Sequence, residues 1–150
     1  MSALPPPFDA HGQHWLNIRV YYEDTDFTGM VYHANYLRFF ERGRSDFLRD
    51  AGVSHQNLLA RETPAAFTLT NVEVDYKKAA KVDDLLTIRT RCLGTKGVRM
   101  FFEQTCLRGE EIIAEGRITA VMIHADGRPM RPIKEVVEQL KPYEFNAEAE

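Results

Sequence analysis

Residues 22–36 hold the densest group of chemically reactive side chains in this 150-residue chain. The segment reads Tyr-Glu-Asp-Thr-Asp-Phe-Thr-Gly-Met-Val-Tyr-His-Ala-Asn-Tyr, so it combines carboxylates, hydroxyls and an imidazole. A carboxylate with an ordinary pKa of ~3.9 is ionised at neutral pH, and it can act as a general base or as a nucleophile. The segment is therefore the first candidate for a catalytic site.

A helix is predicted to begin directly after the acidic part of this segment. The first backbone N–H groups of an α-helix have no acceptor within the helix, and together they carry about +0.5 of an elementary charge. Such groups can stabilise an oxyanion that develops on a substrate carbonyl. Losing one donor of this kind raises a reaction barrier by ~2.7 to 4 kcal/mol. The sequence thus places carboxylates and oxyanion donors within one short stretch.

The same segment carries a motif that extends into the predicted helix. From residue 21 it reads Tyr-Tyr-Glu-Asp-Thr-Asp-x-x-Gly-x-Val-Tyr-His-Ala-x-Tyr, and from residue 39 it continues Phe-x-Glu-Arg-x-Arg. This pattern resembles the acyl-CoA thioesterases associated with the Tol-Pal system, which belong to the broader 4-hydroxybenzoyl-CoA thioesterase family. The resemblance is strongest over residues 20–44.

The resemblance implies hydrolysis of acyl-CoA thioesters to a free acid and CoA, without a cofactor or a metal. It assigns catalysis to Asp26, with the backbone N–H near His33 polarising the thioester carbonyl. Asp26 could activate water as a general base, which is slightly favoured, or attack the carbonyl itself. Gly29 is expected to adopt a positive φ that lets the backbone approach the acyl group. His33 is a second catalytic candidate that could act as a base, although a pocket-lining or structural role is at least as compatible with the sequence. The substrate-binding residues are expected to be Tyr22, Gly29, Val31 and Tyr32.

Residues 34–51 have the periodicity of an amphipathic helix, which would position the start of the helix beside Asp26. Gly52 follows where a glycine commonly ends a helix. Gly43 lies on the apolar face, where it is ~1 kcal/mol less favourable than alanine, so we expect a facing backbone to approach closely there. Arg44 falls on that face too and must find a partner or reach solvent. The apolar residues of the face are Tyr36, Leu37, Phe39, Phe40, Phe47, Leu48 and Ala51.

One β-strand is predicted before this helix and four after it. Segments in which apolar and polar residues alternate, or which are rich in β-branched and aromatic residues, predict strands over 15–22, 67–76, 85–93, 98–107 and 112–124. Short helices are expected over 54–61 and 133–140. Short turns between the last three strands predict an antiparallel meander. This order indicates the α+β class, and with the resemblance it implies a hotdog fold, in which an antiparallel five-stranded sheet wraps around one long helix.

Composition and charge restrict the partners and the compartment. A formal net charge of −3 gives no indication of a nucleic-acid or membrane-surface partner. No segment reaches the ~18 apolar residues of a membrane span, and residues 1–13 lack the features of a secretory signal. Cys92 and Cys106 form no CxxC pair, so we expect buried free thiols and a cytoplasmic protein. Residues 1–150 are expected to form a single domain, with flexible tails at 1–13 and 142–150.

The acidic residues of the motif could also have other roles. The acids of the motif and His33 could bind a divalent metal, but their spacing fits neither an EF-hand loop nor a zinc set. Glu23 and Asp24 are expected to be solvated or hydrogen-bonded loop acids. Glu41 could be a second acid that acts on the substrate, although an ion pair with Arg38 or Arg42 is favoured.

Two other functions compete with thioester hydrolysis. The first is an acyl-CoA hydratase or dehydratase of the same fold, and the second is a non-catalytic acyl-CoA sensor. The exposed edges of a five-stranded sheet also predict pairing between protomers, so a homodimer or homotetramer with the site at the seam is expected. Five basic residues could contact the CoA phosphates, although scattered surface Lys and Arg are usually solvated, and no individual contact is assigned: Lys77, Lys78, Lys81, Lys96 and Arg99.

Overall fold

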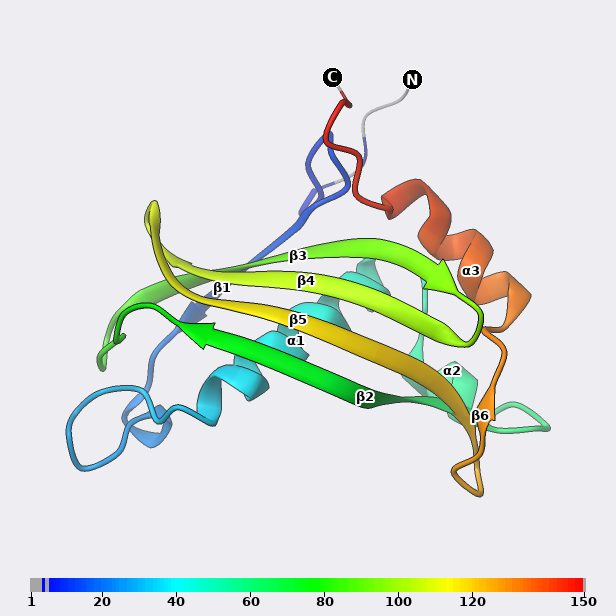
Figure 1. Cartoon of the computed structure of the whole chain (residues 1–150), viewed down its shortest axis with the longest axis horizontal. Coiled ribbons are helices and arrows are strands. Elements are labelled where there is room, and N and C mark those ends of the chain that lie inside the picture. The colour runs from blue at the N-terminus through cyan, green and yellow to red at the C-terminus, as the bar shows by residue number, and fades with distance from the viewer. Residues whose placement is uncertain (1–3, 5, 150) are drawn as a thin grey trace.

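The computed structural model describes residue 4 and residues 6–149, and it consists of one antiparallel sheet that curves around a long helix (Figure 1). The long strands lie in the order β1-β3-β4-β5-β2. They are β1 (His14–Arg19), β2 (Ala65–Tyr76), β3 (Leu85–Lys96), β4 (Arg99–Arg108) and β5 (Glu111–His124), joined by the short β6 (Pro129–Met130). The helices are α1 (Asn35–Asp50), α2 (His55–Leu59) and α3 (Lys134–Leu140), with 3₁₀ turns η1 (Tyr22–Asp24) and η2 (Lys141–Tyr143).

The predicted sheet is confirmed, including the antiparallel meander of β3, β4 and β5. β2 pairs with β5 and β1 pairs with β3, so these two strands form the edges. β6 was not predicted, because its two residues are too few to carry an alternating pattern; it pairs with β5. One edge of the sheet, β2, is therefore a strand of twelve residues whose outer side pairs with no described strand.

The predicted long helix is confirmed as α1, which lies behind the strands in the view of Figure 1. It ends as expected, because Gly52 has a φ of +98° and the Val53 N–H donates to the Leu48 carbonyl at 2.8 Å. Its apolar face packs into two groups of buried residues. Phe39 and Phe40 lie in the group near the helix start, and Phe47 lies in the group near its end.

At Gly43, α1 lies very close to the sheet. A Cβ built on this residue would lie 2.7 Å from Ile88 Cγ2, 2.8 Å from Gln104 Nε2 and 3.0 Å from Thr90 Oγ1. The expected close approach is confirmed, but the facing atoms belong to side chains of β3 and β4 and not to a backbone. The absence of a side chain at Gly43 therefore sets how near the helix can lie to the sheet.

Two local predictions are wrong. Leu37 was placed on the buried face, but it is 42% exposed. The first strand was expected to reach residue 22, but it ends at Arg19, and Tyr22 begins η1. The reason is local: the Asp24 carboxylate accepts a hydrogen bond from the Tyr21 N–H at 2.8 Å, which closes a turn where a strand would need extended backbone.

Parts of both segments that were expected to be flexible tails pack against the sheet. Phe8 is buried beside Phe47, with ring centroids 5.1 Å apart. The Phe145 N–H donates to the Cys92 carbonyl at 2.8 Å, and the Asn146 N–H donates to the His11 carbonyl at 3.0 Å. Residues 8–13 and 143–146 are thus held by packing and hydrogen bonds, whereas residues 1–3, 5 and 150 of the expected tails lie outside the described residues.

The two cysteines are buried free thiols, as predicted. Burial raises the pKa of the Cys92 thiol to about 11 and that of the Cys106 thiol to about 12. Both therefore remain protonated at neutral pH. Among the described residues, no helix has the length and apolar character needed to cross a membrane.

Candidate functional site

The loop between β1 and α1 holds Asp26 in a tight turn. The Asp26 carbonyl accepts from the Gly29 N–H at 3.0 Å, and the Asp26 N–H donates to the Met30 carbonyl at 3.1 Å. Gly29 has a φ of +81°, which confirms the predicted positive φ. The Val31 N–H then donates to the Ala80 carbonyl at 2.8 Å, so the loop is attached to the segment that follows β2.

The Asp26 carboxylate accepts two hydrogen bonds from Thr28. Its Oδ1 accepts from the Thr28 hydroxyl and, at 2.9 Å, from the Thr28 N–H. These bonds hold the pKa of Asp26 below its ordinary value, with the hydroxyl as the largest cause. His33 adds a small favourable charge interaction. The carboxylate is thus ionised at neutral pH and has a defined orientation, although it is exposed to solvent.

The start of α1 is fixed by a second acid of the motif. Asp24 is buried, and its Oδ1 accepts from the Asn35 Nδ2 at 2.8 Å. Its backbone carbonyl accepts from the Tyr32 N–H at 3.0 Å. Asp24 therefore ties the loop to the first residue of the helix, in keeping with its expected role as a hydrogen-bonded loop acid.

Backbone N–H groups at this helix start are available for a ligand. The residue before the helix, Ala34, makes no side-chain cap. Among the described residues, none accepts a hydrogen bond from the N–H of His33 or of Ala34. The Asn35 N–H, in contrast, donates to the Tyr32 carbonyl at 2.8 Å. Free donors beside an ionised carboxylate form the pairing that thioester hydrolysis requires.

A surface cavity of about 470 Å³ joins these groups. Three segments line it: the Asp26 loop, the start of α1 and the end of β2 with the residues that follow. The lining residues are Asp26, Thr28, Met30, Val31, His33, Tyr36, Tyr76, Lys77, Lys78 and Ala79. The cavity therefore brings together three of the residues singled out in the sequence, namely Asp26, Val31 and His33.

Of the other predicted binding residues, Gly29 and Tyr32 lie next to residues that line this cavity, whereas Tyr22 lies away from it. Gly29 lies in the Asp26 turn, and the Tyr32 ring packs against the His33 ring, with centroids 4.6 Å apart. Tyr22 does not reach the cavity. It is 85% exposed and lines a separate cleft with Glu23 and Val82, because η1 turns the chain before the Asp26 loop begins.

Sequence reasoning missed the contribution of β2 to the cavity. The Tyr76 hydroxyl donates to the His33 carbonyl at 2.8 Å, across a separation of 43 residues. Lys77 and Lys78 follow it in the lining, and Lys78 Nζ lies 2.6 Å from Glu111 Oε2. Pairing of β2 with β5 sets this placement, so no local pattern around Tyr76 could have indicated it.

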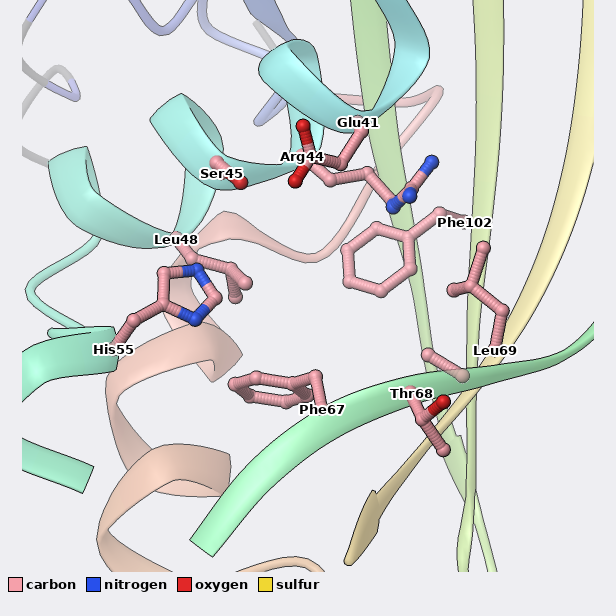
Figure 2. Close-up of a pocket in the computed structure, with 10 residues that line it drawn as sticks. Glu41, Arg44, Ser45, Leu48, His55, Phe67, Thr68, Leu69 and Phe102 are labelled. Atoms are coloured by element: carbon pink, nitrogen blue, oxygen red, sulfur yellow. The ribbon is translucent and has the colours of Figure 1, made fainter. Parts of the chain in front are cut away.

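A second cavity, of about 290 Å³, lies between the later turns of α1, α2 and β2 (Figure 2). Glu41 and Arg44 extend into it from α1, while Phe67 and Thr68 border it from β2. Arg44 Nη1 donates to Gln104 Oε1 at 3.0 Å, and burial lowers the pKa of the guanidinium.

Glu41 does not form the ion pair that was favoured for it. Within the described part of the chain, no Lys or Arg nitrogen lies within 4.0 Å of its carboxylate, and none of the acids lies that close to Arg44. Arg44 is half-buried and Glu41 is exposed, so this cavity holds two opposite charges that form no ion pair within the described part of the chain.

Comparison with known proteins agrees with the fold and with the position of the motif. Residues 20–140 match the model of the thioesterase-like superfamily. The acyl-CoA thioesterase YbgC of Haemophilus influenzae is 40% identical over 116 residues, which cover 77% of this chain and 83% of that protein. The acyl-CoA thioester hydrolase YbgC of Escherichia coli is 37% identical over 116 residues, which cover 77% of this chain and 84% of that protein.

A solved structure of a probable thioesterase has the same fold as this chain. The probable thioesterase from Bartonella henselae superposes with a TM-score of 0.78 at 41% identity, over 81% of this chain and 99% of that chain. The family match over residues 20–140 includes the long helix and the loop that holds Asp26. The chain belongs to the thioesterase-like superfamily, and its antiparallel sheet around one long helix is the hotdog fold of thioesterases.

Proposed function

We propose that this protein hydrolyses acyl-CoA thioesters to a free acid and CoA, with Asp26 as the catalytic carboxylate. The observation that carries the proposal is the single cavity shared by the ionised Asp26 carboxylate and the start of α1, where two backbone N–H groups have no acceptor among the described residues. The names of the relatives, acyl-CoA thioesterase and acyl-CoA thioester hydrolase, support the same substrate class.

The reaction needs a nucleophile on one side of the carbonyl and charge stabilisation on the other. In the favoured route, Asp26 removes a proton from a water molecule as that water attacks the thioester carbon. The oxyanion that forms accepts hydrogen bonds from the free N–H groups near His33. Collapse of the intermediate breaks the C–S bond and releases CoA as a thiolate, which takes up a proton. In the alternative route Asp26 attacks the carbon directly, and water then hydrolyses the mixed anhydride.

The remaining residues of the motif would form the binding surface. Val31 and the ring of Tyr32 offer apolar contact for the acyl group. Gly29, which has no side chain and lies at a positive φ, leaves room for the substrate beside the catalytic carboxylate. The His33 ring is exposed at the same cavity, where it could contact the substrate or carry a proton.

Replacement of Asp26 by asparagine tests the proposal. Because loss of a general base typically lowers a rate by ~10²- to 10⁴-fold, D26N should lose nearly all turnover of short-chain and aromatic acyl-CoA substrates, measured as release of the CoA thiol. The matched control is Glu23→Gln, which neutralises a neighbouring exposed acid that lines a different cleft. Normal hydrolysis by D26N would refute the assignment. Loss of crotonyl-CoA absorbance without thiol release would instead indicate a hydratase.

We also infer a homo-oligomer built on the outer edge of β2. That edge carries Leu69 and Val72, which are 40% and 38% exposed. Its outer side pairs with no strand in the described part of the chain, so its backbone groups can pair with a second β2. A two-fold axis beside β2 repeats every contact in both directions. Glu41 of one protomer would then meet Arg44 of the other, and two reciprocal ion pairs would supply the partners that each chain lacks within itself.

The motif and the relatives suggest the setting of this activity. We infer a cytoplasmic protein, because the proposed substrates carry CoA, which is a cytoplasmic cofactor, and because both cysteines are free thiols. The motif that begins at residue 21 also supports the branch of the family associated with the Tol-Pal system. The test is to attach an affinity tag to this protein and to purify it from cell-envelope extracts in mild detergent. Copurification of Tol-Pal components would support the association, and their absence from the purified sample would count against it.

A further inference from the structure

Tyr36 lies at the floor of the cavity that contains Asp26. It is 3% exposed and Val31 is 7% exposed, whereas the other residues that line this cavity are exposed. We propose that the Tyr36 hydroxyl donates a hydrogen bond to an oxygen atom of the acyl group, so that the site selects short acyl groups that carry such an oxygen. This inference rests on the proposed thioester hydrolysis and names the class of acyl group on which the site acts.

Two hydrogen bonds place the Tyr36 hydroxyl between two segments of the cavity wall. The Ala80 N–H donates to the hydroxyl oxygen at 3.2 Å, and the Ala80 carbonyl accepts from the Val31 N–H at 2.8 Å. Val31 lines the cavity, and so does Ala79, the neighbour of Ala80 in the chain. The hydroxyl therefore lies where the Asp26 loop meets the segment that follows β2.

The proton of the Tyr36 hydroxyl is available to a bound molecule. A phenol can donate one hydrogen bond as well as accept, and none of the described residues accepts from this one. Burial raises the pKa of Tyr36, so the proton stays on the oxygen at neutral pH. The Tyr76 hydroxyl of the same cavity differs, because it donates to the His33 carbonyl at 2.8 Å.

The acyl group is the part of the substrate that can reach this floor. The nucleotide of CoA is large and negatively charged, which suits the open side of the cavity, where Lys77 and Lys78 are exposed. Deeper in the cavity, the Tyr36 ring meets the Tyr76 ring edge to face, with centroids 5.6 Å apart. A purely apolar acyl group would cover the hydroxyl without accepting its proton, whereas an acyl oxygen would satisfy it.

The test compares butyryl-CoA with the two enantiomers of 3-hydroxybutyryl-CoA, which add one hydroxyl to the same chain. CoA release is measured for the wild type and for Tyr36→Phe, which removes the phenol hydroxyl and keeps the ring. Leaving a buried polar group unpaired corresponds to a ~5- to 150-fold change in an equilibrium or rate. The ratio of kcat/KM for the better enantiomer to that for butyryl-CoA should therefore fall by about this factor in Y36F.

The ratio separates substrate recognition from a structural role of Tyr36. Loss of the acceptor for the Ala80 N–H could lower the activity of Y36F, but it would lower the activity on both kinds of substrate alike and leave the ratio unchanged. Tyr76→Phe is the matched control, because it removes a second phenol of the cavity whose proton is already taken. Its ratio should equal that of the wild type. A wild-type ratio in Y36F would overturn the role of Tyr36.

A measurement on the wild type alone covers the case in which Y36F does not fold, as thermal unfolding would show. The wild type should hydrolyse at least one enantiomer as well as butyryl-CoA. If it hydrolysed both enantiomers ~5- to 150-fold less well, the added hydroxyl would have no partner in the site, and the inference would be wrong. Activity on other acyl-CoA substrates but on none of these three would also overturn it. Absence of activity on every acyl-CoA tested would refute the proposed function itself.

Discussion

Replacing Gly43 by alanine should destabilise the protein, although alanine is the better helix former. The gain is at most ~1 kcal/mol, because glycine in a helix interior is less favourable than alanine by about that amount. Against it stands the added methyl group. It would lie 2.7 Å from Ile88 Cγ2 and 2.8 Å from Gln104 Nε2, and Cβ atoms in folded proteins essentially never lie within 3.0 Å of such neighbouring heavy atoms. Overpacking of this kind typically costs ~1 to 3 kcal/mol.

Gln104 increases the cost because it cannot move freely. Its Nε2 donates to the Phe40 carbonyl at 2.8 Å and to Thr90 Oγ1 at 2.9 Å, while its Oε1 accepts from Arg44. Displacing this buried amide would leave donors unsatisfied, at ~1 to 3 kcal/mol. The sum predicts that G43A lowers the free energy of unfolding by about 1 to 5 kcal/mol.

Thermal and urea unfolding of G43A check this prediction. A loss of 1 kcal/mol should lower Tm by about 2 °C or more in a chain of this size. Arg38→Ala, at an exposed position of the same helix, should change stability by less than ~0.5 kcal/mol and serves as the control. If G43A were as stable as the wild type, the side chains of the sheet could move aside without cost, and Gly43 would not set the position of the helix.

Two further predictions concern the carboxylate and the protomer contact. Thr28→Val removes the hydroxyl that contributes most to the low pKa of Asp26, so this pKa should rise toward its ordinary value. Because hydrolysis needs the ionised form, the acidic limb of the pH-rate profile should move to higher pH, and an unmoved limb would contradict the role of Asp26. For the inferred contact, Glu41→Arg and Arg44→Glu should each weaken self-association in sedimentation experiments, and the double variant E41R/R44E should restore it. Failure of the double variant to recover would rule out the reciprocal pairing.

Local patterns in the sequence were enough to predict most of the fold. The apolar periodicity of residues 34–51 predicted α1 to within one residue at each end, and Gly52 marked its end. The five long strands followed from β-branched and aromatic runs. The sequence did not predict where the first strand ends, because the hydrogen bond from the Tyr21 N–H to the Asp24 carboxylate decides that point. It also did not predict β6, because two residues are too few to show a strand pattern.

The candidate site divides in the same way. Asp26 and His33 lie within one continuous motif next to a helix start, so the sequence indicated them together. Tyr76 reaches the same cavity only because β2 pairs with β5, and such a contact between distant segments has no signature in the spacing of residues. Helical periodicity favoured Arg38 or Arg42 as the partner of Glu41, whereas the structure places the exposed Glu41 at a cavity with Arg44.

The burial of Cys92 and Cys106 has a practical consequence for every kinetic experiment above. Released CoA is readily followed with a chromogenic disulfide reagent, which reacts with thiolates. In the native protein both side chains are enclosed, and their pKa values of about 11 and about 12 leave almost no thiolate at assay pH. The enzyme should therefore contribute no colour of its own while folded, and a slow rise in an enzyme-only blank would report loss of the native state.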